Sequence, residues 1–66
     1  MTAREVETIL ERAGCVLLRQ TDHRIWQKGE LSVPVPSQRG DLKTGTLRSI
    51  VRFAGMSVDE FLSYRS

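Results

Sequence analysis

The chain has few of the residues that cross-link a small protein or bind a metal. It contains one cysteine and one histidine among its 66 residues. Cys15 alone cannot form a disulfide within the chain, and a structural zinc site normally needs four cysteine or histidine ligands. A chain of this length buries only about 60% of the surface that its unfolded form exposes. We therefore expect one small domain, residues 1–66, with no metal and no cofactor.

The sequence also lacks a long apolar run. A membrane-spanning helix needs about 18 or more apolar residues, and no segment approaches that length. The first residues, Thr2 to Glu5, have the pattern of a helix start rather than of a signal peptide. The single cysteine, interpreted as a small buried hydrophobic residue, is consistent with a reducing compartment. The sequence predicts a cytoplasmic protein that does not contact a membrane.

Charge is unevenly distributed along the chain, although the net charge is only +2. The segment from Arg19 to Arg52 contains seven basic and three acidic residues, a balance of +4, whereas the two ends together carry −2. A basic middle is typical of proteins that bind polyanions, and it is equally typical of an ordinary solvated surface. Charge alone therefore leaves nucleic-acid binding open.

The N-terminal segment has the periodicity of an amphipathic helix. Thr2 and Glu5 form a capping box, in which each side chain accepts a hydrogen bond from the other residue's backbone N–H. Apolar residues follow at helical spacing, and Gly14 stands where helices commonly end in the left-handed conformation. We predict a helix over residues 3–13.

Two further helices are predicted near the C-terminus. Apolar residues from Leu47 to Ala54 repeat the spacing of the first helix, with Thr44 as the N-cap and Gly55 as the closing residue. Ser57 begins an S-x-x-E box, which predicts a last short helix from that residue.

Between these helical segments lie three runs that are rich in β-forming residues. They are separated by Thr21-Asp22 and Gly29-Glu30, each short enough for a tight hairpin. The third run includes Pro34, which cannot donate to a sheet ladder and therefore favours an edge position. The predicted strands are residues 15–20, 23–28 and 31–35, followed by a loop over residues 36–41.

The resulting order is α-β-β-β-α with a short terminal helix, an α+β fold. Two amphipathic helices can cover one face of a three-stranded antiparallel sheet and leave the other face exposed. This layout resembles that of double-stranded-RNA-binding domains. Many small α+β domains share the order, so the fold class alone does not specify a function.

The single histidine, His23, begins the second predicted strand. An imidazole can accept or donate a proton near neutral pH. Cleavage of RNA without a metal needs such a group to take the proton of a 2′-hydroxyl, whose oxygen then attacks the adjacent phosphate. Arg24 and Lys28 are close in the sequence and are expected to stabilise the charged phosphorane. The alternative is an ordinary surface histidine without a catalytic role.

Three blocks of sequence carry a resemblance to a known family. The blocks are Arg19-Gln20 with His23-Arg24-Ile25-Trp26, then Ser32-Val33-Pro34-Val35-Pro36, and then Asp41-Leu42-Lys43-Thr44-Gly45-Thr46-Leu47-Arg48-Ser49-Ile50. In this order and at this spacing they resemble the HicA toxin family. Its members show an R-Q…G-S-H-x-x-aromatic strand, a V-P-V segment and a D-L-K-x-G-T-L-R-x-I helix start. The resemblance extends from about Glu5 to Gly55.

The resemblance implies a small ribonuclease toxin that cleaves messenger RNA (mRNA) and is held inactive by a HicB-like antitoxin. It also implies the α-β-β-β-α fold and a catalytic histidine on the second strand, the position of His23. The family's Gly-Ser before that histidine is Thr21-Asp22 here, in a turn that is one residue shorter. Asp22 has two interpretations, an anion close to the phosphate position or a carboxylate that orients the imidazole.

Other candidate RNA contacts are spread along the chain. Trp26 is expected either to stack on a base or to pack in the protein. Lys43, Thr46 and Arg48 lie at and after the start of the predicted helix that contains Leu47 to Ala54. Backbone N–H groups at that start are expected either to hold a phosphate or to form an ordinary capped, solvated helix end. The predicted site is therefore catalytic His23, with RNA-binding Arg24, Trp26, Lys28, Lys43, Thr46 and Arg48.

Three functions fit the sequence. The first is an mRNA-cleaving toxin with His23 in acid–base catalysis. The second is a module of the same fold that binds RNA without cutting it. The third is a domain that binds only the antitoxin and has lost its toxicity.

Overall fold

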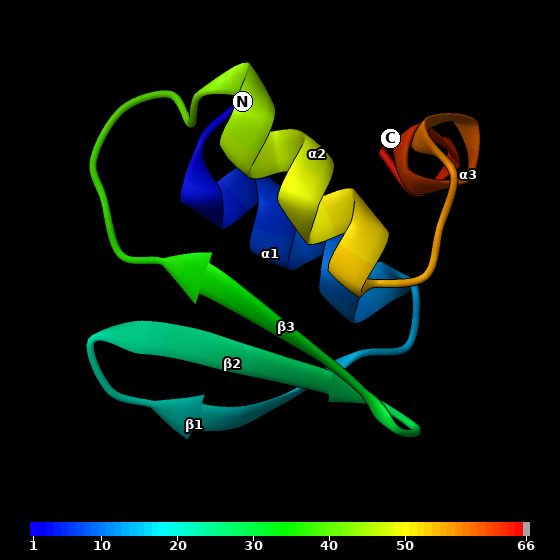
Figure 1. Cartoon of the computed structure of the whole chain (residues 1–66), viewed down its shortest axis with the longest axis horizontal. Coiled ribbons are helices and arrows are strands. Elements are labelled where there is room, and N and C mark those ends of the chain that lie inside the picture. Colours follow the sequence, from blue (N-terminus) through cyan, green and yellow to red (C-terminus); the bar gives the residue numbers. More distant parts are fainter. Residues whose placement is uncertain (66) are drawn as a thin grey trace.

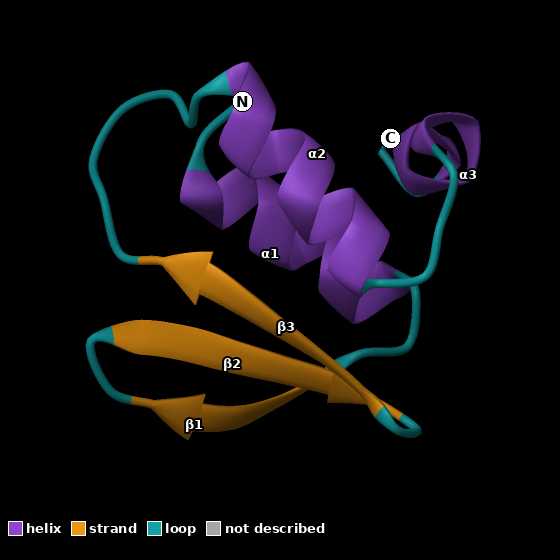
Figure 2. Ribbon diagram, in the orientation of Figure 1, coloured by secondary structure: helices purple, strands orange, loops and turns teal. Residues whose placement is uncertain are grey.

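The helices and strands of the computed structural model follow the predicted order (Figure 1). The structure describes residues 1–65. Its elements are α1 (Ala3–Arg12), β1 (Val16–Gln20), β2 (His23–Lys28), β3 (Leu31–Pro36), α2 (Thr44–Phe53) and α3 (Val58–Ser63). The helices lie on one side of the sheet (Figure 2). The α+β class and the α-β-β-β-α arrangement are thus confirmed. No helix within residues 1–65 has the length and apolar character to cross a membrane.

The capping box predicted at the start of α1 is present. The Thr2 backbone N–H donates to Glu5 Oε1 at 3.0 Å, and the Glu5 N–H donates to Thr2 Oγ1 at 3.2 Å. The hydrogen bond from the Thr2 backbone is the main reason that the pKa of Glu5 is lowered from its ordinary value. Gly14 follows the helix with φ of 98°, the left-handed conformation that its position predicted.

The start of α2 differs from the prediction. Thr44 is the first helical residue, and Lys43 is the N-cap, with extended backbone and no side-chain hydrogen bond to the helix. The prediction of Thr44 as the N-cap is therefore wrong. A lysine ammonium has donors and no acceptor, so it cannot pair with the free N–H groups of a helix start. At α3, by contrast, the Ser57 hydroxyl accepts from the Glu60 N–H at 3.1 Å.

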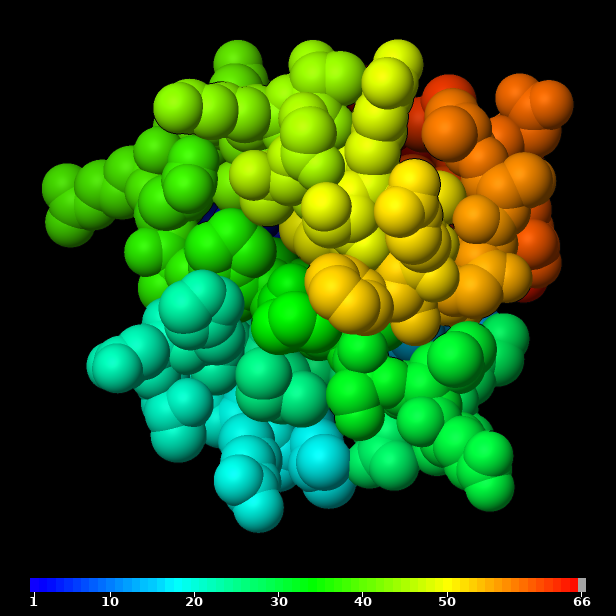
Figure 3. Space-filling view, in the orientation of Figure 1, coloured from blue at the N-terminus to red at the C-terminus, as the bar shows by residue number. Residues whose placement is uncertain are grey.

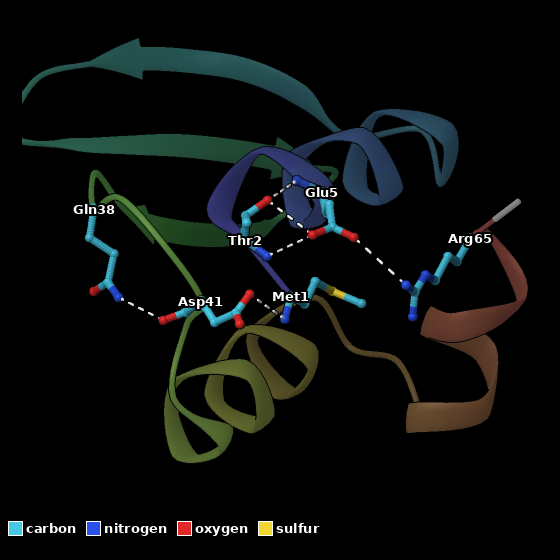
Figure 4. A network of polar contacts seen from close by, with 6 residues as sticks. All are labelled: Met1, Thr2, Glu5, Gln38, Asp41 and Arg65. Carbon is cyan, nitrogen blue, oxygen red and sulfur yellow. Dashed lines mark hydrogen bonds and ion pairs between the residues drawn. The ribbon is translucent and has the colours of Figure 1, made fainter.

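Polar contacts fasten the loop before α2 to the start of α1 (Figure 4). The Met1 ammonium donates to Asp41 Oδ1 at 3.2 Å, and the Leu42 N–H donates to the Met1 carbonyl at 2.8 Å. Gln38 Nε2 donates to the Asp41 carbonyl at 3.3 Å. These contacts hold the ends of the two long helices together.

The sheet has the strand order β1-β2-β3, and both pairings are antiparallel. β3 runs one residue further than predicted, because Pro36 pairs with His23. Cys15 lies just before β1 and is buried, so it joins the core instead of the strand. The core between sheet and helices is apolar, and its largest fully buried side chains are Ile9, Leu10, Ile50, Val6, Val33 and Val35.

Candidate functional site

Successive residues of β2 point to opposite faces of the sheet. Trp26 is 5% exposed and faces the helices, where its indole N–H donates to Glu7 Oε2 of α1 at 2.8 Å. Arg24 points the same way, and its Nε donates to the same carboxylate oxygen. His23 and Ile25 therefore point to the opposite face, which none of the helices α1, α2 and α3 covers (Figure 2) and which we call the outer face.

His23 sits beside a hairpin that holds its backbone and leaves its side chain exposed. The Thr21 N–H and the Thr21 hydroxyl both donate to the His23 carbonyl, each at 3.2 Å. Within residues 1–65 the imidazole has no hydrogen bond or ion pair, and none joins it to Asp22. The interpretation of Asp22 as a carboxylate that orients the imidazole therefore does not hold in this structure.

The sequence suggested that Arg24 and Lys28 lie beside the imidazole of His23. In the structure they do not. Both are an odd number of residues from His23 on the same strand, so their side chains point to the helix-facing side of the sheet. Lys28 is also at the other end of β2, about 17 Å along the strand at the usual rise per residue. The expectation that these two cations stabilise a phosphorane at His23 is not met by this geometry.

Trp26 packs in the core and does not present its ring to solvent. Of the two interpretations that the sequence left open, packing is the one that the burial and the hydrogen bond to Glu7 support. A ring that is 5% exposed offers no face on which a base can stack. Trp26 is therefore a residue of the core.

A shallow groove is lined by Arg24 and by a second cation, Arg39, which was not among the predicted site residues. The groove has a volume of about 360 Å³ and lies between the start of α1, Arg24 and the loop after β3. Arg39 lines it from that loop and is exposed. Arg24 uses its Nε on Glu7, and its side chain is 31% exposed. The groove thus carries two guanidinium groups and one carboxylate.

The three candidates at the N-cap and in the first turns of α2 lie in the helix layer and not on the outer face. Lys43 is exposed at the N-cap, and Thr46 is half-buried in the first turns. Arg48 is exposed and lines a hollow between α2 and α3 together with Arg52. The structure therefore separates the predicted RNA-binding residues onto several surfaces and groups none of them with His23.

Arg19 lies on the outer face with His23, although it was not among the predicted site residues. It pairs with Ile25 because the register of β1 shifts between Leu17 and Arg19. Such a β-bulge has no sequence signature as clear as a turn dipeptide. A regular hairpin would have placed Arg19 on the helix-facing side, so the sequence offered no direct sign of this arrangement.

Cys15 is not a candidate nucleophile. Its side chain is 3% exposed, and burial raises the pKa of its thiol above the ordinary value. A protonated, buried thiol is unreactive. Within the described part of the chain, no three Asp, Glu, His or Cys side chains come together as a possible metal site.

Together, the fold and the site define a small α-β-β-β-α domain with a free histidine at the start of its second strand. The model of the family described as HicA toxin of bacterial toxin–antitoxin matches residues 3–56. The chain belongs to this family. It is therefore the toxin component of a toxin–antitoxin system, in which its partner is an antitoxin. The matched region ends before α3. A comparison with curated proteins yields no match.

Proposed function

We propose that the chain is an endoribonuclease toxin that cleaves mRNA in the cytoplasm, with His23 in acid–base catalysis. Membership of the HicA toxin family supports a toxin that acts with an antitoxin. The single observation that carries the assignment of His23 is its exposed imidazole, which no other described residue engages, at the strand position of the family's histidine.

The proposed reaction is a transesterification within the RNA chain. His23 accepts the proton of a 2′-hydroxyl, and the 2′-oxygen attacks the adjacent phosphorus. The bond from phosphorus to the 5′-oxygen breaks, and that oxygen takes up a proton. The products are a 2′,3′-cyclic phosphate and a free 5′-hydroxyl. Because the imidazole faces solvent on the outer face, an RNA strand can reach it without any opening of the fold.

The remaining cations are proposed to guide the RNA backbone to His23. Arg24 and Arg39 share one groove, whereas Lys43 and Arg48 lie along α2 with Thr46 beside them. Lys28 is proposed as a more distant contact at the other end of β2. Contacts of this kind attract a polyanion without regard to its sequence, and they weaken with added salt.

A HicB-like antitoxin is proposed to inhibit the toxin by covering the strand that begins with His23. A partner that binds only the folded chain raises its stability by about 2.7 kcal/mol at one hundred times the dissociation constant. The complex should therefore melt above the free toxin and slow hydrogen exchange from His23 to Trp26. Slowed exchange that is confined to α1 would mean that inhibition works through another surface.

Induced expression in growing cells tests the proposed function. Wild-type protein should arrest growth, and the folded His23→Ala variant should not, with circular dichroism of both proteins as the control for folding. Co-expression of the antitoxin should restore growth in the wild type. Equal growth arrest by wild type and folded variant would remove His23 from the mechanism, and no arrest by either would favour a domain that only binds its antitoxin.

A further inference from the structure

The bulge in β1 determines which face Arg19 occupies. Leu17 pairs with Trp26, so a regular ladder would continue with Leu18 opposite Ile25 and Arg19 opposite Arg24. Two like charges directly opposite each other destabilise a sheet. The bulge makes Leu18 the additional residue and places Arg19 opposite Ile25 instead. The guanidinium is thereby transferred to the outer face, the face of His23.

Arg19 and His23 are diagonal neighbours across β1 and β2, since His23 precedes Ile25 by two residues on the same face. Diagonal positions of this kind lie about 7–8 Å apart, within reach of a long side chain. Arg19 is exposed, and within residues 1–65 its side chain has no hydrogen bond or ion pair. Its guanidinium donors are therefore available beside the imidazole.

An apolar floor adjoins this pair. Ile25 pairs with Pro34 across β2 and β3, and the next outward pair is His23 with Pro36. Ile25, Pro34 and Pro36 are each half-buried, so part of every side chain remains accessible. The three strands contain basic residues and no aspartate or glutamate. This surface therefore combines a free guanidinium, an imidazole and an apolar floor. Its strands carry no carboxylate, and Asp22 lies in the turn directly before His23.

We propose that this surface is a nucleotide-binding site for single-stranded RNA, on the outer face beside His23. Arg19 binds the phosphate next to the reacting 2′-hydroxyl, because a guanidinium pairs with two phosphate oxygens at once. The base of the same nucleotide lies on Ile25 and Pro34. The site takes the role that the buried Trp26 cannot fill, and it rests on the function proposed above.

Two matched oligonucleotides test the site. The first is a short single-stranded RNA in which fluorine replaces every 2′-hydroxyl, so that it cannot be cleaved by the proposed reaction. The second has the same backbone without its bases. We expect wild-type protein to bind the first about tenfold more tightly than the second, as measured by fluorescence anisotropy, because the base buries apolar area on the aliphatic floor.

The variants separate the base contact from the phosphate contact. Ile25→Thr with Pro34→Ser should reduce the tenfold preference to about twofold or less, because less apolar area is buried under the base, with the baseless strand bound as before. Arg19→Gln should weaken binding of both strands alike and lower the salt slope of log affinity by about 0.7. Leu62→Thr, at an exposed position of α3, is the matched apolar-to-polar control. It should change neither the base preference nor the salt slope. Circular dichroism and melting verify the fold, and Arg19→Gln alters only an exposed side chain.

Each other result overturns the site in a distinguishable way. If the base preference survives the double substitution, or Arg19→Gln leaves both affinities unchanged, the nucleotide lies elsewhere. If wild type binds neither strand but still cleaves RNA, the site fails while the proposed function stands. If wild type neither binds nor cleaves RNA, both fail. If the double substitution weakens antitoxin binding alone, the outer face is a surface for protein docking.

Discussion

The carboxylate of Glu7 and the indole of Trp26 are joined by a hydrogen bond of 2.8 Å, which links α1 to the centre of β2. The same oxygen also accepts a hydrogen bond from Arg24 Nε. One carboxylate of α1 therefore binds two side chains that lie next to each other on the helix-facing side of β2. The side chain of Glu7 is 17% exposed, and Trp26 is buried. This link helps to fix which residues of β2 face the helices and which face outward.

Removal of that carboxylate should destabilise the fold. Glu7→Ala leaves the buried Trp26 N–H without an acceptor, which costs about 1–3 kcal/mol, while the partly exposed ion pair with Arg24 adds little. Urea denaturation followed by circular dichroism measures the loss. Glu11→Ala, at an exposed position of α1, is the control and should cost less than about 0.5 kcal/mol. Equal losses in the two variants would mean that the link contributes no net stability.

A side chain at Gly55 should destabilise the fold. Its φ is 70°, and a Cβ there would lie 2.9 Å from Leu31 Cδ1. Gly55→Ala should therefore combine a left-handed penalty of about 1 kcal/mol with a steric one. Gly29→Ala is the matched control, because its φ is 60° and no atom lies within 4 Å of the added Cβ. Thermal melting should show a larger loss at Gly55, and Leu31→Ala should reduce the difference. A loss at Gly29 as large as at Gly55 would show that the contact with Leu31 does not matter.

The capping box should make stability depend on pH. The pKa of Glu5 is lowered in the folded chain, chiefly by the Thr2 backbone N–H. Its stabilisation is therefore fully present above the pKa of the unfolded chain and is lost as pH falls through the folded value. Glu5→Gln should be less stable than wild type at pH 7, and the two should converge as pH falls below the ordinary glutamate pKa of about 4.3 and through the lower pKa of the folded chain. A difference in stability that stays constant from pH 7 to pH 3 would contradict this role for the ionised carboxylate.

RNA affinity should depend on cations away from His23. Arg39→Gln and Lys43→Gln should each weaken binding of single-stranded RNA of any sequence and lower the salt slope by about 0.7. Arg4→Gln, at an exposed position of α1 outside the proposed RNA contacts, is the charge-matched control and should change the affinity and the salt slope less. An affinity of the wild-type protein that does not change between low and high salt would rule out this electrostatic guidance.

The arrangement of helices and strands was predictable because its signals are local. Capping residues, glycines in the left-handed conformation and two short polar turns all lie next to the elements that they delimit. The opposite orientation of His23 and Arg24 also follows from strand alternation, a signal that the prediction of a common site for them overlooked. The placement of Arg19 was not predictable, because a bulge depends on how a strand packs across the sheet. The burial of Trp26 likewise depends on Glu7, which lies 19 residues away.

Cleavage of RNA by the purified protein is the most direct test of the role proposed for His23. The substrate is a single-stranded RNA, assayed with a chelator present, beside the same strand with its 2′-hydroxyls replaced by hydrogen. Wild type should cut the RNA and leave 2′,3′-cyclic phosphate ends, and it should not cut the deoxy strand. His23→Ala should lose activity by about 100-fold or more with its fold intact. Cleavage by the folded variant at the wild-type rate, or equal cleavage of the deoxy strand, would contradict the account.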